Sequence, residues 1–112
     1  MRVDLLVPSP SSRELFQRNR ERFIPLGAGC YTLTTFSGSI IYIGLSESLR
    51  RRFGEHLDNP SKTAETRFGR AFFFYWIETP DTFKVERTWL NIHLVQEGLL
   101  PVLNSNYSPV ST

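Results

Sequence analysis

Three short stretches of the chain carry the hydrophobic pattern of β-strands. Leu33 and Thr35 alternate with their neighbours in the first, residues 40–43 are a β-branched and aromatic run in the second, and Gly38 between them favours a hairpin turn. The third stretch, residues 71–78, is apolar or aromatic at both alternating sets of positions, which is typical of a strand covered on both faces. We therefore expect an α+β fold, a small three-stranded antiparallel sheet flanked by helices on both faces.

A helix is predicted directly after the hairpin. Its apolar positions recur every four residues, at Leu49, Phe53 and Leu57. Ser46 is the expected N-cap, because its side chain can accept a hydrogen bond from the free amides of the first turn. On a helical wheel Arg52 and His56 lie beside the apolar stripe, whereas Arg50 and Arg51 point toward solvent. The helix therefore presents one arginine and one histidine, one turn apart, where helix and sheet meet.

Two further helices are predicted outside this stretch. One spans residues 82–97 and is stopped by Gly98. The other is an extra N-terminal helix over residues 12–22, opened by a capping box in which Ser11 precedes Glu14 by three positions. The polar residues 58–70 are expected to form an exposed loop.

The hairpin turn decides whether Tyr31 and Tyr42 can act together. A two-residue loop pairs Thr35 with Tyr42, and a four-residue loop pairs Tyr31 with Tyr42. Both registers place the two hydroxyls on one face of the sheet, because side chains alternate with a period of two. A three-residue loop separates them unless a bulge intervenes, and the sequence leaves the register open.

One acidic residue interrupts the apolar side of the predicted helix 82–97. Glu86 falls between Trp89 and Leu90 on the wheel. A carboxylate placed where desolvation disfavours its charge is paired, protonated or bound to a cation, so Glu86 is a candidate site residue. His93, two turns further on, is either a metal ligand or a hydrogen-bonded core residue, and a lone histidine on an apolar face more often has the second role.

The stretch from residue 29 to residue 56 resembles the GIY-YIG endonuclease superfamily, which is named after two tripeptides on adjacent strands. The tripeptides read Gly29-Cys30-Tyr31 and Tyr42-Ile43-Gly44 here, with Cys30 at a position that is structural in the family. The family's essential arginine in the following helix matches Arg52, and the histidine found one turn later in many members matches His56.

The resemblance continues to the C-terminal part of the chain. The metal-binding glutamate of the family matches Glu86, and its apolar pair matches Trp89-Leu90. The proline and asparagine that follow the helix match Pro101 and Asn104. The similarity therefore covers about residues 29–104.

This resemblance implies a metal-dependent DNA endonuclease that hydrolyses phosphodiester bonds with a single divalent cation, Mg²⁺ or Mn²⁺, held by Glu86. It implies that Tyr31 is the general base, that Tyr42 and His56 support the nucleophile and the phosphate, and that Asn104 steadies the glutamate. From the residues alone, either tyrosine can accept the proton, and Arg52 can fork onto the phosphate. DNA contacts are expected from five further residues: Gly44, Ser46, Lys62, Arg67 and Arg70.

Composition adds a few constraints. The formal net charge of +2 does not by itself indicate nucleic acid, so the location of the arginines matters more than their number. The single cysteine, Cys30, excludes an intramolecular disulfide and a cysteine-based zinc site and is expected to be a small buried strand residue. The apolar residues 5–7 are too few for a signal peptide, and no stretch approaches a membrane span, so an intracellular, cytoplasmic protein is expected.

The length of 112 residues predicts one domain with no room for a separate target-recognition domain. We expect an N-terminal extension over residues 1–28, the nuclease-like domain over 29–104 and a tail over 105–112. Such a chain would prefer DNA structure over sequence, depend on a partner protein, or form a homodimer. Repair, restriction and mobile-element roles stay open. The alternative functions are a catalytically silent nucleic-acid-binding module and an interaction subunit with the same fold.

Overall fold

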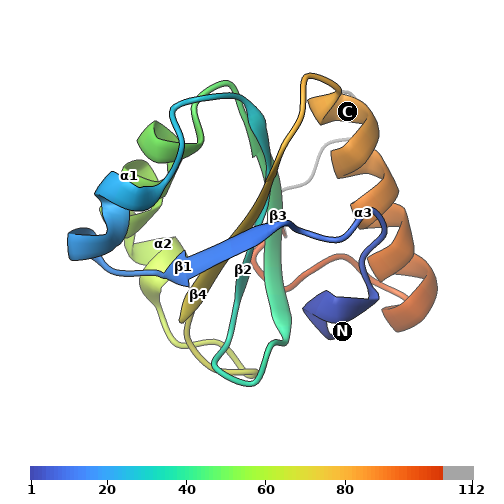
Figure 1. The fold of residues 1–112 in the computed structure, drawn as a ribbon. Helices are drawn as coiled ribbons and strands as arrows, with labels where there is room; N and C mark the ends of the chain where they lie inside the picture. The colour runs from blue at the N-terminus through green and yellow to red at the C-terminus, as the bar shows by residue number, and fades with distance from the viewer. Residues whose placement is uncertain (105–112) are drawn as a thin grey trace.

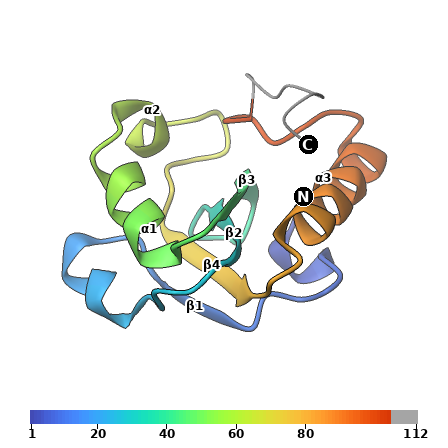
Figure 2. The ribbon, with the colours of Figure 1, turned by 90° about the horizontal axis from the view of Figure 1, so that it is seen from above.

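A four-stranded antiparallel sheet lies between two layers of helices in the computed structural model (Figure 1). Residues 1–104 are described, and the predicted tail, residues 105–112, lies outside them. The strands are β1 (Ser12–Leu15), β2 (Gly29–Thr34), β3 (Ile40–Ser46) and β4 (Phe73–Glu78), in the spatial order β1-β4-β2-β3. One face is covered by α1 (Leu49–Leu57) and α2 (Pro60–Thr63), and the other by α3 (Thr82–Glu97), with the short 3-10 helix η1 (Val3–Leu5) beside it (Figure 2).

The fourth strand lies where the sequence predicted the N-terminal helix, and that prediction is wrong. Residues Ser12–Leu15 form β1, which pairs with β4, and the helical part is only the 3-10 helix η2 (Arg18–Phe23). Ser11 does not cap a helix, because its N–H donates to the carbonyl oxygen of Trp76 at 2.9 Å. Pairing with β1 satisfies backbone groups along an edge of β4 that would otherwise stay open.

Strand β4 is buried from both sides, as its sequence predicted. Phe74 and Trp76 belong to the core on the α1 side, where they pack with Phe53. Tyr75 and Ile77 pack against the second core, which α3 closes. The two helical layers therefore follow from the double-faced apolar pattern of this one strand.

The hairpin has neither the register of the two-residue loop nor that of the four-residue loop, but follows the third case of the sequence analysis, in which a bulge intervenes. Tyr31 pairs with Gly44 and Leu33 with Tyr42, and the register then shifts so that Thr34 pairs with Ile40. The shift is a β-bulge, which inserts one extra residue into β3. Residues 31 and 33 point to the same side of β2, so the bulged register still places both tyrosines on one face.

Helix α1 begins two residues later than predicted. Its N-cap is Ser48, whose side chain accepts from the Arg51 amide, whereas Ser46 ends β3. The preceding segment supplies the missing acceptors, because the amide of Leu49 donates to the Gly27 carbonyl oxygen at 3.0 Å. The first turn of α1 is thus held by tertiary contacts as well as by its cap.

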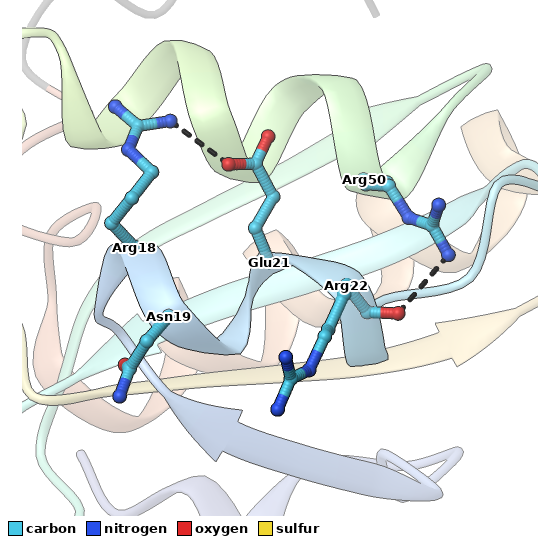
Figure 3. Close-up of a pocket in the computed structure, with 5 residues that line it drawn as sticks. All are labelled: Arg18, Asn19, Glu21, Arg22 and Arg50. Atoms are coloured by element: carbon cyan, nitrogen blue, oxygen red, sulfur yellow. Dashed lines mark hydrogen bonds and ion pairs between the residues drawn. The ribbon is translucent and has the colours of Figure 1, made fainter.

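Arg50 does not point toward solvent, contrary to the wheel. Its Nε donates to the Ile24 carbonyl oxygen at 2.8 Å and its Nη2 to the Arg22 carbonyl oxygen at 3.2 Å (Figure 3). These bonds fasten α1 to η2. Next to these bonds lies a cavity of about 410 Å³, which is lined by Arg18, Asn19, Glu21, Arg22 and Arg50.

Two segments that connect strands and helices have features that were not predicted from the sequence. The predicted loop 58–70 contains the one-turn helix α2, capped by the side chain of Asn59. After α3 ends at Gly98, with φ of 77°, the chain returns to the open edge of β3, where the Leu103 amide donates to the Ile41 carbonyl oxygen at 2.9 Å. Within residues 1–104, none of the helices has the length and apolar character needed to cross a membrane.

We predict that Gly29→Ala lowers the free energy of unfolding by about 2–3 kcal/mol. A Cβ at this position would run into the backbone carbonyl oxygen of Ile77, which the sheet holds in place. Urea denaturation followed by circular dichroism measures the effect. Gly27→Ala is the matched control, because its Cβ would meet only the mobile carboxylate of Glu78 at 3.2 Å. Equal losses in the two variants would contradict this account.

Candidate active site

The two signature tripeptides are brought together by a close approach between Tyr31 and Gly44. Tyr31 on β2 is 0% exposed, and its ring stacks on Phe74 at 4.9 Å between centroids. A Cβ on Gly44 would lie 2.5 Å from the Tyr31 hydroxyl oxygen and 2.9 Å from the Tyr42 ring. Only glycine at this position of β3 leaves room for the Tyr31 ring to cross the neighbouring strand.

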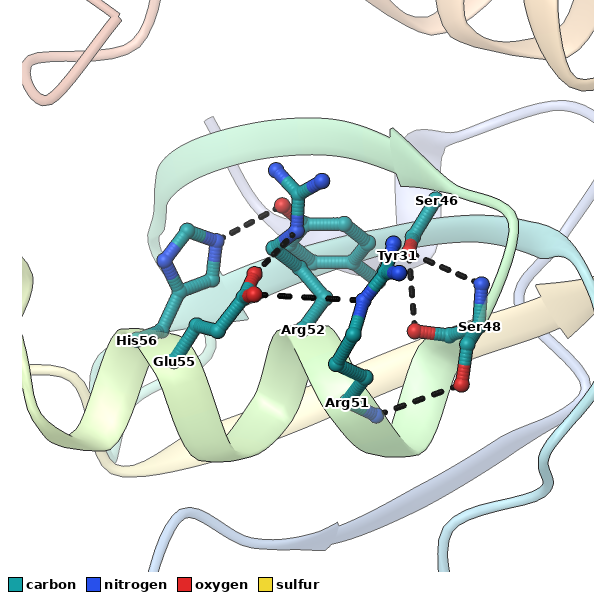
Figure 4. A network of polar contacts seen from close by, with 7 residues as sticks. All are labelled: Tyr31, Ser46, Ser48, Arg51, Arg52, Glu55 and His56. Carbon is teal, nitrogen blue, oxygen red and sulfur yellow. Dashed lines mark hydrogen bonds and ion pairs between the residues drawn. The ribbon is translucent and has the colours of Figure 1, made fainter.

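The Tyr31 hydroxyl reaches α1, the helix that follows the hairpin. It forms a hydrogen bond of 2.7 Å with Nε2 of His56, which is buried on α1 (Figure 4). Burial lowers the pKa of His56 to about 3, and the nearby charges of Lys62 and Arg52 act in the same direction. A neutral imidazole next to a phenol can accept a hydrogen bond from the phenol, so His56 can orient the Tyr31 hydroxyl.

Tyr42 lies at the outer side of this pair. Its ring centroid is 6.0 Å from that of Tyr31 and 5.3 Å from that of His56, and the side chain is partly exposed. The ammonium of Lys62, on α2, sits over its ring at 4.7 Å from the centroid. Burial raises the pKa of Tyr42, while the Tyr31 hydroxyl and Arg52 oppose the rise. Of the two tyrosines, Tyr42 is therefore the one in contact with solvent.

Arg52 is held by an acidic residue that sequence reasoning missed. Its Nε lies 3.0 Å from a carboxylate oxygen of Glu55, and Arg51 reaches the other oxygen at 3.8 Å (Figure 4). The Arg52 Nε is buried, and its contact with Glu55 lacks the geometry of a straight hydrogen bond. Helical spacing of three and four residues was the signal that would have found Glu55. The pairing leaves the outer edge of the Arg52 guanidinium available for an anion.

Glu86 comes from the opposite layer, on α3, and is half-buried. Burial raises the pKa of its carboxyl group, opposed by the charge of Arg87. The Glu86 carboxylate in turn raises the pKa of Tyr31 and Tyr42, so it lies within electrostatic reach of both hydroxyls. Within residues 1–104 its carboxylate makes no hydrogen bond or ion pair with a side chain.

Asn104 forms hydrogen bonds with β3, an edge strand of the sheet. Its Nδ2 donates to the Ile43 carbonyl oxygen at 2.9 Å, and its Oδ1 accepts from the Ile43 amide at 3.0 Å. Both backbone groups of the central residue of the second tripeptide are thereby satisfied. The expected contact with the glutamate is therefore replaced by a clamp on β3, next to Tyr42 and Gly44.

Three of the five residues that were expected to contact DNA lie near this cluster, either in sequence or in space. Gly44 faces Tyr31, Lys62 covers Tyr42, and Ser46 forms a local turn with Ser48. The other two point elsewhere. Arg67 lines a separate cavity that His93 also lines, and Arg70 is exposed with its Nε 3.4 Å from a Glu65 oxygen.

His93 and Cys30 have structural roles. The Nδ1 of His93 is 2.7 Å from the Leu99 carbonyl oxygen and the ring is 3% exposed, which is the core alternative of the sequence analysis. Cys30 is buried, its Sγ lies 3.1 Å from the Thr82 carbonyl oxygen, and burial raises the pKa of its thiol to about 12. Neither residue is poised for chemistry at the tyrosine cluster.

The carboxylates do not form a multi-ligand metal cage. Residues 1–104 contain no group of three or more His, Cys, Asp or Glu side chains that could hold an ion together. Glu86 nevertheless fits one hard cation, because it offers unpaired carboxylate oxygens in a partly desolvated place. Mg²⁺ commonly binds through one or two carboxylates while it keeps several waters.

Comparison with known families bears on this arrangement. The family model described as the GIY-YIG catalytic domain matches residues 27–94, which is more than half of the chain. The chain belongs to the GIY-YIG family. No curated protein matches the sequence. The family assignment indicates a phosphodiester-hydrolysing nuclease, a nucleic-acid substrate and a divalent metal ion.

We predict that acid destabilises this GIY-YIG domain before its carboxylates titrate. The unfolded chain protonates His56 as the pH falls through its ordinary pKa of 6.5, whereas the folded chain does so only near pH 3. Stability is therefore full above pH 6.5 and declines below it, by up to about 1.4 kcal/mol per pH unit for this group. His93, whose pKa burial also lowers, adds to the slope in the same direction.

Urea unfolding at several pH values between 7.5 and 5.5 measures this slope. His56→Gln should be less stable at neutral pH but show a shallower decline, because the variant has lost one proton-binding site of the unfolded state. His93→Gln separates the second contribution. A decline as steep in both variants as in the wild type would refute the assignment to buried histidines.

Proposed function

We propose that this GIY-YIG nuclease is a DNA endonuclease that works with a single divalent cation, Mg²⁺ or Mn²⁺, held by Glu86. The observation that carries the proposal is one cluster built from β2, β3, α1 and α2, and reached electrostatically by Glu86 from α3. It combines two phenols, a neutral imidazole, two cations and a desolvated carboxylate. The GIY-YIG resemblance supports DNA as the nucleic acid that is cut.

The cations bind the scissile phosphate. The outer edge of Arg52 offers paired N–H donors to phosphoryl oxygens, and Lys62 supplies a point charge over the ring of Tyr42. Burial lowers the pKa of Lys62 and keeps its ammonium poorly hydrated, so an incoming phosphate restores charge balance there. Glu55 holds Arg52 in place before the substrate arrives. These donors stabilise the charge that develops as the phosphorus is attacked.

The two tyrosines orient the attacking water through their hydroxyl groups. Tyr42 has solvent access and can orient the water, while the buried Tyr31 hydroxyl lies between it and His56. The neutral His56 ring can accept a hydrogen bond from the Tyr31 hydroxyl and fix its orientation, so the phenol oxygens can accept a hydrogen bond from the attacking water. A cation bound by Glu86 would lower the pKa of the water and neutralise charge on the phosphate. Glu86 would hold that cation within electrostatic reach of the two hydroxyls.

The single cluster in the described residues bears on target choice. Residues 1–104 form one sheet with its helices and carry one such cluster, so a cut in both strands needs two encounters or two copies. We propose that the chain acts as a structure-preferring nuclease, with a homodimer or a partner protein as the ways to address two strands.

We predict that Glu86→Gln and Arg52→Gln each reduce nicking of supercoiled plasmid by about 100- to 1,000-fold, the usual cost of removing one charge-stabilising group. Chelation of the cation with EDTA should abolish nicking by the wild type. Glu97→Gln is the matched control, because it neutralises a more exposed carboxylate on the same helix. Undiminished nicking by both site variants would favour the silent binding module or interaction subunit, with a contaminant as the source of activity.

We further predict that Tyr31→Phe and His56→Gln cause similar losses of kcat and that the double variant is no worse than either single one. Two residues joined by one hydrogen bond act as a unit, so their effects are not additive. Single-turnover cleavage measures all three variants, with circular dichroism as the folding control. Losses that multiply in the double variant would show that the two residues act independently.

A further inference from the structure

A cluster of phenylalanines stands outside both hydrophobic cores, at the far end of the sheet. Phe36, in the β2–β3 turn, is 74% exposed, and Phe72, just before β4, is 38% exposed. Their ring centroids are 5.0 Å apart, and Phe73 lies 4.9 Å from Phe72 and 6.4 Å from Phe36. We call Phe36, Phe72 and Phe73 the aromatic platform. The turn that carries it forms the lower end of the sheet in Figure 1.

The backbone beneath the aromatic platform is fixed. The Phe72 amide donates to the Thr34 carbonyl oxygen at 2.7 Å, and the Phe72 carbonyl oxygen accepts from the Phe16 amide at 2.9 Å. In the turn, the Gly38 amide donates to the Thr35 carbonyl oxygen at 3.0 Å. The rings are therefore presented by hydrogen-bonded strands rather than by a loose loop, and little order has to be imposed when a ligand binds.

Arginines flank the aromatic platform on two sides. The guanidinium of Arg13 lies over the Phe73 ring at 4.4 Å and donates to the Tyr75 hydroxyl at 3.2 Å. Arg13 makes no ion pair with a carboxylate in the part of the chain that the structure describes. On the other side, Arg2 donates to the Ser37 carbonyl oxygen at 2.6 Å, next to Phe36. Exposed aromatic rings with arginines beside them, one of which has no carboxylate partner among the described residues, match a ligand that has both flat apolar faces and negative charge.

The aromatic platform is separate from the catalytic cluster. Phe36 lies in the turn five residues after Tyr31, and β2 ends at Thr34, so the two residues are at most roughly 17 Å apart. Within residues 1–104, the neighbouring acidic groups are already engaged: Asp4 pairs with Arg2, and Glu14 with Arg20. Asp4 compensates Arg2, so Arg13 is the platform arginine without a carboxylate partner among residues 1–104.

We propose that the aromatic platform binds unpaired nucleotides of the nucleic acid that the catalytic cluster cuts, an inference that rests on the proposed nuclease function. Each base has a π-face that stacks on phenylalanine, and Arg13 and Arg2 balance the phosphates between the bases. Bases inside a duplex are stacked on one another and present no free face. The platform therefore selects substrates with a single-stranded segment near the cut, within roughly 17 Å of Tyr31.

Fluorescence anisotropy with labelled oligothymidylate of about 15 nucleotides, near the largest site size of single-strand-binding domains, tests the proposal in EDTA, where no cleavage occurs. Wild type should bind, and Phe36→Ala should bind about tenfold more weakly, the loss expected for one stacked base. Phe36→Trp should bind at least as well as wild type. Phe83→Ala is the control, because Phe83 is 61% exposed on α3 and has no arginine over its ring. Arg13→Gln should reduce the salt dependence by about 0.7 in the slope of log affinity against log salt.

Nicking of duplex plasmid with Mg²⁺ is measured on the same variants. Phe36→Ala should nick at the wild-type rate, because the aromatic platform is remote from the cluster. No binding of oligothymidylate by the wild type, or equal binding by wild type and Phe36→Ala, would overturn the proposal. So would a Phe36→Ala effect on self-association with none on oligonucleotide affinity, which would mark a protein interface. Nicking that fails while the binding differences hold would instead refute the nuclease proposal alone.

Discussion

The structure depends on the passage of one buried aromatic ring across a glycine. Tyr31 leaves the central strand, stacks on Phe74 and reaches His56 on α1. That path exists only because Gly44, directly opposite in the register, has no side chain. A single close contact therefore links both signature strands and helix α1, and it couples the packing of the core to the arrangement of the tyrosine cluster.

Desolvation is the second constraint, and it gives the cluster its chemical state. His56 stays neutral because the core disfavours its charged form, and the same burial raises the pKa of both tyrosines and of Glu86. The permanent cations are kept nearer the rim, on α1 and α2. Such an arrangement holds oriented donors and acceptors in place before the substrate arrives, so little reorganisation is needed during the reaction.

The residues before the first tripeptide are part of this construction. Strand β1 completes the sheet. The side chain of Arg50 holds α1 against η2 by donating to backbone carbonyl oxygens. Glu21 adds to this contact, because its carboxylate lies 2.6 Å from the position that a Cβ of Gly54 would take. These contacts set the position of α1 and hence of Arg52 and His56. The first 28 residues thus help to hold α1 in position.

The sequence alone was sufficient for the hairpin, for α3 and for the doubly covered β4, because each rests on a local pattern of apolar residues. It also named Glu86, since a carboxylate inside an apolar arc is conspicuous without coordinates. Only the tertiary structure decided that residues 12–15 are a strand, because the capping box at Ser11 is a weak local preference that loses to an unpaired edge of β4. The bulge that brings the tyrosines to one face and the split of the β4 region into buried rings and the exposed Phe72 likewise depend on partners distant in the chain. Local periodicity specifies which side chains share a face, but burial is set by what packs against that face, and the latter is not written in the neighbouring residues.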